Sequence, residues 1–326
     1  MPTDMPPLML AAHVTAYGGP EVIDLRRIPR PVPRAGEVRL RILASPVTSG
    51  DMRLRSRKVP RGMGLPVRLA VGWSGPRNPI PGWGFVAEVV SGDGLPAGTR
   101  VAGLAGFRGG AHAEYICMAA NGPLLPVPPS LDTTQTAALL FGGLTAAHFL
   151  IDRARLTPSD RLWINGATGA VGCAALRLAR HIGAQVTATA SAPREDLARS
   201  LGANAFQPYE NGSPQGPFDV VMDVIGTAPY ARAHTLLAPG GRHLAVTATL
   251  AETLAALLRP RSGGHHRIAG TNSDDRPALQ RVLSLMESGA LAPIPAQTFA
   301  FPEIRAAHAV AETLHKLGAL VLLMDR

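Results

Sequence analysis

Short apolar segments interrupted by glycine and proline dominate the first third of the chain. Three short runs contain apolar residues interspersed with polar ones, at residues 37–47, 85–92 and 99–107. Each run follows a glycine. Runs of this length between glycines and prolines are typical of β-strands. We therefore predict a mostly β module in this region.

The pattern changes near Ser130, where alanine- and leucine-rich segments begin to alternate with short apolar strands. The predicted strands are RLWIN, QVTATA, FDVVMDV and GRHLAVT, at residues 161–165, 185–190, 218–224 and 241–247. Strands that alternate with helices are typical of βαβ units around a parallel sheet. We find no internal repeat that would indicate a solenoid instead.

Glycines mark the ends of the predicted helices, as expected where the last residue turns left-handed. The helices cover residues 171–182, a segment after Pro193, and residues 274–288, and the glycines that end them are Gly183, Gly202 and Gly289. From residue 293 onward the pattern predicts an extended stretch, a helix and a terminal strand. The stretch RPRSGGHHRIAG, at residues 259–270, predicts a flexible loop.

A glycine-rich turn, NGATGAVG at residues 165–172, lies between a predicted strand and an amphipathic helix. This order is the one that dinucleotide binding requires, because the helix N-terminus offers free N–H groups to a pyrophosphate. In an AxGxxG reading, Ala167 makes the tight turn, Gly169 lets the backbone approach the pyrophosphate and Gly172 lets the helix pack on the sheet. The alternative is a turn that serves packing alone.

The end of the following strand indicates which dinucleotide is bound. An NAD site normally places an acidic residue about 20 residues after the motif, on the ribose 2′-hydroxyl. This chain has Ser191 there, and Arg194 follows. A guanidinium can hold a 2′-phosphate by charge-assisted hydrogen bonds, so the sequence favours NADPH over NADH. The alternative for Arg194 is a solvated residue in a first helical turn.

Composition narrows the class of protein. The chain has 326 residues, of which 46% are hydrophobic and 17% charged, which suggests two domains. The sequence has no apolar run long enough to span a membrane and no signal-peptide pattern at its start, so we expect a cytoplasmic protein. Its two cysteines are too few for a disulfide framework or a four-thiolate zinc site.

The net charge of +9 raises the question of nucleic-acid binding. The basic residues are almost all arginines, however, and they are scattered among acidic residues along the chain. This distribution indicates coding bias, and we expect no nucleic-acid partner. One dense run, at residues 53–62, predicts either a solvated loop or a site that attracts an anion.

Several segments, in this order along nearly the whole chain, resemble motifs of the medium-chain dehydrogenase/reductase superfamily, and specifically its zinc-independent quinone-oxidoreductase-like branch. The segments are SPVTSGDMRLR, IPGWGFVAEVV, AGTRVAG, GGAHAEYICM, FGGLTAAHFL, NGATGAVG, LGANAF, FDVVMDVIG and LAPGGR. The resemblance implies an α/β fold in which a GroES-like, mostly β catalytic domain carries an inserted Rossmann domain with a doubly wound parallel sheet. It implies a catalytic domain at residues 1–122 that is completed by residues 291–326, a Rossmann domain at residues 123–290, and a homodimer.

The resemblance also implies a set of cofactor-binding residues in the cleft between the domains. They are Thr145 near the nicotinamide, Gly166, Ala167, Thr168, Gly169, Ala170, Val171 and Gly172 in the glycine-rich turn, Ser191, Arg194 and Tyr209 around the 2′-phosphate, and Val224, Gly226 and Thr247 in later turns. The catalytic candidates are Thr48 and Asp51, which would position substrate or nicotinamide. Their alternative role is the hydrogen bonding of a turn, because VTSGD is good turn chemistry.

No metal is expected. A catalytic zinc needs three protein ligands, and where zinc-dependent relatives place theirs this chain has Thr48, Trp83 and Gly84. His265 and His266 lie on the predicted loop and form only an isolated pair. The chain departs from the family motifs at two further positions. Thr99 stands in place of the Asp of VGDRV, and Ala319 stands in place of the lysine of a terminal GKxVL segment.

These features predict an NADPH-dependent oxidoreductase that transfers hydride to a small-molecule quinone or α,β-unsaturated carbonyl. No tyrosine follows Asp51 where enoyl reductases of the superfamily often carry a proton donor, so we expect the proton to come from water. The alternatives are a dedicated enoyl or ketone reductase of one biosynthetic pathway, and a catalytically silent NADPH-binding scaffold.

Overall fold

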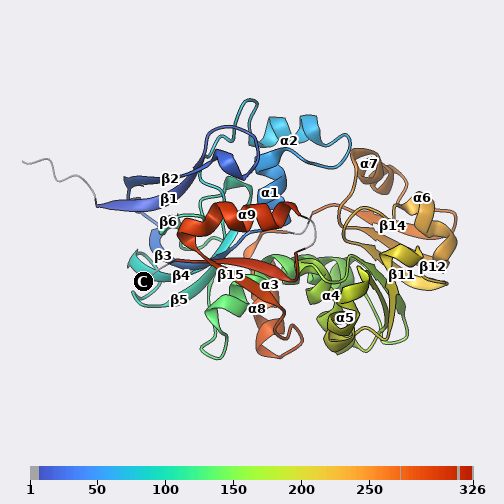
Figure 1. Cartoon of the computed structure of the whole chain (residues 1–326). Helices are drawn as coiled ribbons and strands as arrows, with labels where there is room; N and C mark the ends of the chain where they lie inside the picture. The colour runs from blue at the N-terminus through green and yellow to red at the C-terminus, as the bar shows by residue number, and fades with distance from the viewer. Residues whose placement is uncertain (1–6, 272, 314–315, 325–326) are drawn as a thin grey trace, which may run out of the picture.

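The computed structural model describes residues 7–271, 273–313 and 316–324. The chain forms two lobes that lie side by side (Figure 1). A mostly antiparallel β domain occupies the left of this view, and a parallel α/β domain occupies the right. The predicted fold class is therefore confirmed.

The first domain is built on a seven-stranded sheet in the order β15-β16-β3-β4-β5-β7, with β6 paired to β3. Its strands are β3 (Glu37–Pro46), β4 (Gly84–Gly92), β5 (Arg100–Leu104), β6 (Tyr115–Ala119), β7 (Leu124–Pro126), β15 (Ala296–Ala300) and β16 (Ala319–Leu323), and β1 (Leu8–Val14) pairs separately with β2 (Ile23–Pro29). The predicted strands of the first third correspond to β3, β4 and β5. Because β7 pairs with β5, this sheet reaches Pro126, four residues past the predicted boundary.

The end of the chain returns to the first domain. Strand β16 runs antiparallel to β3, with Val321 opposite Pro46. Figure 1 shows the red C-terminal segment, with α9 (Ile304–Glu312), lying against the blue N-terminal strands. The C-terminal segment thus reaches the cleft between the domains from the side of the first domain.

The second domain has a seven-stranded sheet in the order β10-β9-β8-β11-β12-β14-β13. Its strands are β8 (Arg161–Asn165), β9 (Gln185–Ala190), β10 (Ala205–Pro208), β11 (Phe218–Asp223), β12 (Leu237–Ala245), β13 (Arg261–Ser262) and β14 (His265–Ala269). All neighbouring strands are parallel except β13 and β14. The strand order reverses at β8, and the crevice at such a reversal is where open α/β sheets bind ligands.

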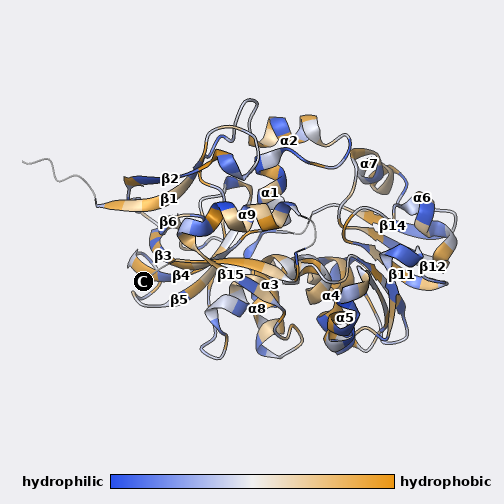
Figure 2. Cartoon of the chain, viewed as in Figure 1, coloured by the Kyte–Doolittle hydropathy of each residue, from blue (hydrophilic) through white to orange (hydrophobic). Residues whose placement is uncertain are grey.

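The α-helices of the described chain are α1 (Ser49–Ser56), α2 (Gly64–Val71), α3 (Thr133–Ala147), α4 (Ala170–Ile182), α5 (Glu195–Leu201), α6 (Tyr230–Ala233), α7 (Leu250–Leu258), α8 (Arg276–Glu287) and α9. A π-helical turn, His148–Arg153, extends α3, and 3-10 turns cover Pro20–Val22, Gly106–Arg108, Ala192–Arg194, Tyr209–Asn211, His234–Leu236 and Phe301–Glu303. Hydrophobic residues run along many of the strands, whereas the helices carry both polar and hydrophobic residues (Figure 2).

Two sequence predictions are wrong. Residues 259–270 are not a loop, because β13 and β14 form a hairpin there and β14 pairs with β12. Gly263 and Gly264 both have positive φ, which two-residue hairpin turns favour. The strand that follows was not predicted, because its HHR run is polar. The basic run at residues 53–62 is not wholly a solvated loop either. It begins in α1, where the Arg55 side chain is buried.

One helical stretch, Thr133–Arg153, is long and apolar enough to cross a membrane, by length and composition. Of its most apolar part, 72% is buried inside the protein, as in the core helix of a globular domain. The stretch packs between the two domains, where α3 contacts α4 on one side and β3 on the other. Its apolar character therefore follows from its place in the core.

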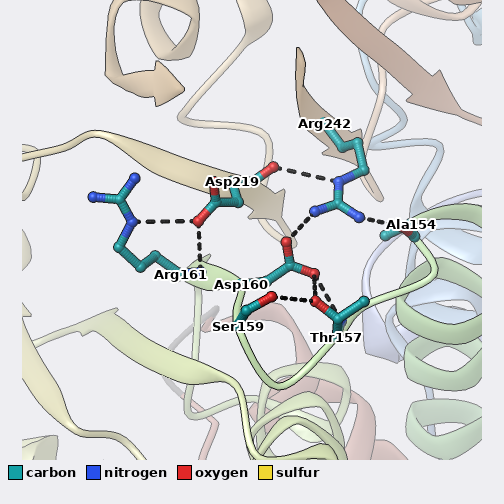
Figure 3. Close-up of polar contacts among 7 residues, drawn as sticks. All are labelled: Ala154, Thr157, Ser159, Asp160, Arg161, Asp219 and Arg242. Carbon is teal, nitrogen blue, oxygen red and sulfur yellow. Dashed lines mark hydrogen bonds and ion pairs between the residues drawn. The ribbon is translucent and has the colours of Figure 1, made fainter. Parts of the chain in front are cut away.

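A polar cluster ties the strands of the second sheet together at the end opposite the glycine-rich turn (Figure 3). Arg242 forms an ion pair with Asp160 and donates to the Ala154 carbonyl at 2.6 Å. Asp219 accepts from the Arg161 N–H at 2.8 Å. These contacts fix the amino ends of β8 and β11, and leave the carboxyl ends of the strands open toward the cleft.

Candidate active site

A cleft of about 680 Å³ lies between the two domains. Its walls come from α1 and the end of β3 in the first domain, and from the glycine-rich turn and the ends of β9, β11 and β12 in the second. Such a size suits a cofactor together with a small substrate. Most of the cofactor-binding residues that the family resemblance implies line this cleft.

The glycine-rich turn leaves β8 and enters α4 at the cleft. Gly166 has φ +92°, and a Cβ there would lie 2.6 Å from Ile225 Cγ2. The tight turn is therefore made by Gly166, which corrects the prediction that Ala167 makes it. At Gly172 a Cβ would lie 2.2 Å from the Gly166 carbonyl oxygen, so the absence of a side chain lets α4 pack closely on the turn. The prediction was that Gly172 allows close packing of the helix on the sheet.

Gly169 is the N-cap of α4. A Cβ on this residue would meet no atom within 4 Å, and no side chain caps the helix. The first residues of α4, Ala170 and Val171, line the cleft at the positive end of a 13-residue helix. This arrangement fits the pyrophosphate of a dinucleotide.

Most of the predicted cofactor-binding residues line the cleft. They are Thr145, Gly166, Thr168, Gly169, Ala170, Val171, Ser191, Arg194, Tyr209, Val224 and Thr247. The exceptions are Ala167, Gly172 and Gly226, which shape the backbone around it. Thr145 donates to the Phe141 carbonyl at 2.8 Å, within α3.

Ser191, Arg194 and Tyr209 come together at the carboxyl ends of β9 and β10. The Arg194 N–H donates to the Ser191 carbonyl at 2.9 Å, which closes the 3-10 turn before α5. Burial, with smaller contributions from Asp223 and Glu210, raises the pKa of Tyr209 to about 12. The Tyr209 phenol therefore stays neutral and can donate to an anionic group.

Thr48 and Asp51 form the capping box of α1. Thr48 Oγ1 donates to Asp51 Oδ2 at 2.6 Å and accepts from the Asp51 N–H at 3.1 Å, while the Thr48 N–H donates to the same carboxylate at 2.8 Å. Both residues line the cleft and are buried. The turn-forming role is thus realised, and the Thr48 hydroxyl already gives its proton to Asp51.

The residues at the zinc-ligand positions are used for packing. The Trp83 indole N–H donates to Asp274 Oδ2 at 2.8 Å, and its ring meets Phe141 edge-on at a centroid distance of 5.4 Å. Gly84 begins β4, and its carbonyl accepts from Ser45 at 2.8 Å. Among the described residues, no group of three or more His, Cys, Asp or Glu side chains could hold a metal ion.

Four of the described cationic residues that line the cleft were not predicted as site residues: Arg53, Arg55, Arg108 and Lys316. Arg53, on α1, spans the cleft and donates to Thr247 Oγ1 at 3.3 Å, and burial lowers the pKa of its guanidinium. Lys316 lines the same wall as Asp51. The signal that could have found Lys316 is its rarity, since the chain has only two lysines.

A buried polar group lies behind α1. Arg55 donates to His308 Nδ1 at 3.3 Å and to the Gly18 carbonyl at 2.6 Å, and it forms an ion pair with Glu312. Burial and the nearby His112 and Arg55 charges hold the pKa of His308 well below its usual range. These contacts join α1 to α9 and so fix the wall that carries Asp51 and Arg53.

Comparisons with known proteins agree with this architecture. A family model described as "Zinc-binding dehydrogenase" matches residues 201–322. The chain is 32% identical over 98% of its length to the spectinabilin polyketide synthase system protein NorB of Streptomyces orinoci, of which it spans only 15%. It is 28% identical to the quinone oxidoreductase of Rattus norvegicus, over 73% of each chain.

A solved structure, the quinone oxidoreductase from Coxiella burnetii, has the same fold. The TM-score is 0.83 at 24% identity, covering 98% of this chain and 100% of the other. The fold and these relatives are those of a family of oxidoreductases. The chain belongs to the medium-chain dehydrogenase/reductase superfamily, in its quinone-oxidoreductase-like part.

Proposed function

We propose that this protein is an NADPH-dependent, zinc-independent oxidoreductase that reduces a quinone or an α,β-unsaturated carbonyl. One observation carries the proposal. A single cleft joins a glycine-rich turn that fits a dinucleotide to an apolar chamber whose zinc-ligand positions hold Thr48, Trp83 and Gly84. The nicotinamide, when bound, supplies the hydride.

The preference for NADPH is supported by the groups at the ends of β9 and β10. Ser191 stands where an acidic residue would repel a 2′-phosphate, and Arg194 and Tyr209 line the cleft beside it. Charge-assisted hydrogen bonds to a phosphate contribute about 1.5–3 kcal/mol each. One such contact makes a ten- to hundredfold difference between NADPH and NADH.

The preference for an activated acceptor is supported by the chamber walls. Large apolar side chains line them, among them Val59, Ile80, Trp83, Phe107 and Phe149. A flat apolar quinone or enone would bury its surface against such walls. Neither acceptor needs a Lewis acid, because conjugation already spreads the negative charge of the product anion.

The similarity to a polyketide synthase protein favours a second candidate of narrower specificity, a dedicated reductase for one biosynthetic enone. A broad acceptor panel that fails while one polyketide-like enone is reduced would favour the dedicated enzyme. NADPH binding with no turnover of any acceptor would instead indicate a cofactor-binding scaffold.

The first test is an acceptor screen that follows the loss of NADPH absorbance with and without a metal chelator. We expect turnover with at least one quinone or enone, and we expect the rate to be unchanged by the chelator. Loss of the rate on chelation, restored by zinc, would overturn the metal-independent mechanism.

We also propose a small-molecule substrate, a homodimeric assembly and a cytoplasmic location, without a nucleic-acid or membrane partner. Exposed leucines on α7 support the homodimer. The free state of Cys117 and Cys173 is compatible with a reducing compartment. Cell fractionation tests the location.

A further inference from the structure

Lys316 is held in the cleft by the backbone around it. The Gly318 N–H donates to the Thr168 carbonyl at 2.8 Å, and Gly318 forms a parallel bridge with Gly169. The segment that carries Lys316 is therefore fastened to the glycine-rich turn, where the cofactor would bind. Its side chain lines the cleft together with Thr48 and Asp51.

The charges around Lys316 come from two helices. Asp51 and Arg53 face it from α1, and His308 on α9 is close enough for the ammonium to lower the histidine's pKa. The glycine-rich turn, NGATGAVG, contains no charged residue. Within the described chain, no side chain or carbonyl forms a hydrogen bond or ion pair with the ammonium.

This environment makes the ammonium a better acid than an ordinary lysine. Burial lowers the pKa of Lys316 to about 8, with Asp51 opposing this shift and Arg53 adding to it. A group of this pKa is mostly protonated at neutral pH and gives up its proton readily. General acids work best when their pKa lies close to the working pH.

We propose that Lys316 is the general acid of the reaction, donating a proton from Nζ to the oxygen of the reduced acceptor. This inference rests on the proposed function and deepens it. It replaces the expectation that water supplies the proton.

Hydride adds to the β-carbon of an enone, and the C=C electron pair moves to the carbonyl oxygen as an enolate. The enolate oxygen takes the proton from Lys316 Nζ, and the resulting enol rearranges to the saturated ketone. With a quinone, hydride addition yields a hydroquinone anion that takes the same proton. The neutral amine then regains a proton from water.

Other groups of the cleft are less suited to this role. The Thr48 hydroxyl already donates to Asp51. Tyr209 lies at the 2′-phosphate end, and its pKa of about 12 makes it a weak acid. Arg53 does not give up a proton in proteins. Among the described residues that line the cleft, Lys316 is the one ammonium.

The test compares Lys316→Gln with Lys58→Gln. Lys58 is the other lysine of the chain; it lies outside the cleft, with 69% of its side chain exposed. We expect the wild-type kcat/KM to fall above a pH of about 8. We expect Lys316→Gln to lower kcat by about 100-fold and to lose this alkaline limb, while its Kd for NADPH is unchanged. Lys58→Gln should behave as wild type.

A shift of the alkaline limb of the pH profile provides an independent check on the role of Lys316. Arg53→Gln removes the cation that opposes the protonated form of Lys316, so the alkaline limb should move to higher pH. A titration of the unliganded protein supplies a readout besides activity. After ¹³C-methylation of the lysines, an NMR signal should titrate near pH 8, be absent from Lys316→Gln and remain in Lys58→Gln.

Two results would overturn this role. One is a Lys316→Gln variant that keeps the wild-type kcat and alkaline limb. The other is a variant that keeps the limb but binds NADPH much more weakly, which would make Lys316 a contact to the cofactor. Failure of the proposed function looks different, because the wild type itself would then turn over no acceptor.

Discussion

Arg194 lines the cleft and is the residue that we propose to distinguish NADPH from NADH. We expect Arg194→Ala to lower the affinity for NADPH by about ten- to hundredfold and to leave that for NADH unchanged, because only NADPH carries the 2′-phosphate. Titration of protein fluorescence with each cofactor measures both values.

Arg199→Ala is the matched control for this variant. Arg199 lies in α5, one turn beyond Arg194, and forms an ion pair with Glu195 on the surface. Loss of the Arg199 side chain should change neither the affinity for NADPH nor that for NADH. Equal losses for NADPH and NADH in Arg194→Ala would remove Arg194 from the 2′-phosphate site.

The sequence predicted the residues of the glycine-rich turn that line the cleft better than those on the opposite side of the cleft. Local order reveals the first, since Gly169 and Gly172 follow a strand and precede a helix. The opposite end is assembled from distant segments, and Lys316 lies near Asp51 because β16, which follows Lys316, pairs with β3. A pattern read along the chain contains no signal for that contact.

Helix α7 carries the clearest apolar surface of a single element. Leu254, Leu257 and Leu258 are 45%, 74% and 75% exposed, and their spacing places them on one face. Burying a leucine contributes about 1.5–3 kcal/mol, so this face can support the proposed dimer. We expect the double variant Leu257→Glu, Leu258→Glu to be a monomer by light scattering, where the wild type is a dimer.

The control for this variant is Leu65→Glu on α2, a leucine that is 58% exposed in the other domain. It should remain a dimer. A wild-type monomer would contradict the assembly itself, and a dimeric double variant would show that α7 is not its interface.

At the element scale, the sequence was most informative where strands are fully buried. Strands β8 and β9 begin and end at the predicted residues, because apolar runs between polar and glycine residues define them. Strand β14 was missed, since it is half-buried and its HHR run has no apolar pattern. Helix α1 was missed because three of its eight residues are charged and its cap resembles a simple turn.

The whole molecule depends on pairings that no local pattern shows. The last strand, β16, completes the sheet that β3 begins, and α9 packs on α1 through the Arg55 contacts. The resemblance to a known family suggested this return of the chain, whereas periodicity alone suggested only a helix and a strand.

Three buried histidines, His112, His243 and His308, should make the protein sensitive to acid. Burial lowers the pKa of each below the ordinary value of 6.5. Below a pH of about 6.5 the unfolded chain therefore binds protons that the folded chain does not. The free energy of unfolding should fall by up to about 1.4 kcal/mol per histidine for each pH unit, down to the pKa of the folded state.

His308 is the residue that tests this expectation. Its Nδ1 accepts from Arg55, so protonation would set two donors against each other. Glutamine can accept from Arg55 through its amide oxygen without titrating. We therefore expect His308→Gln to lose less stability than wild type between pH 7.5 and pH 5.5 in urea unfolding, whereas exposed His234→Gln should follow the wild type. An unfolding free energy that is the same at both pH values in the wild type would contradict the neutral state of these histidines.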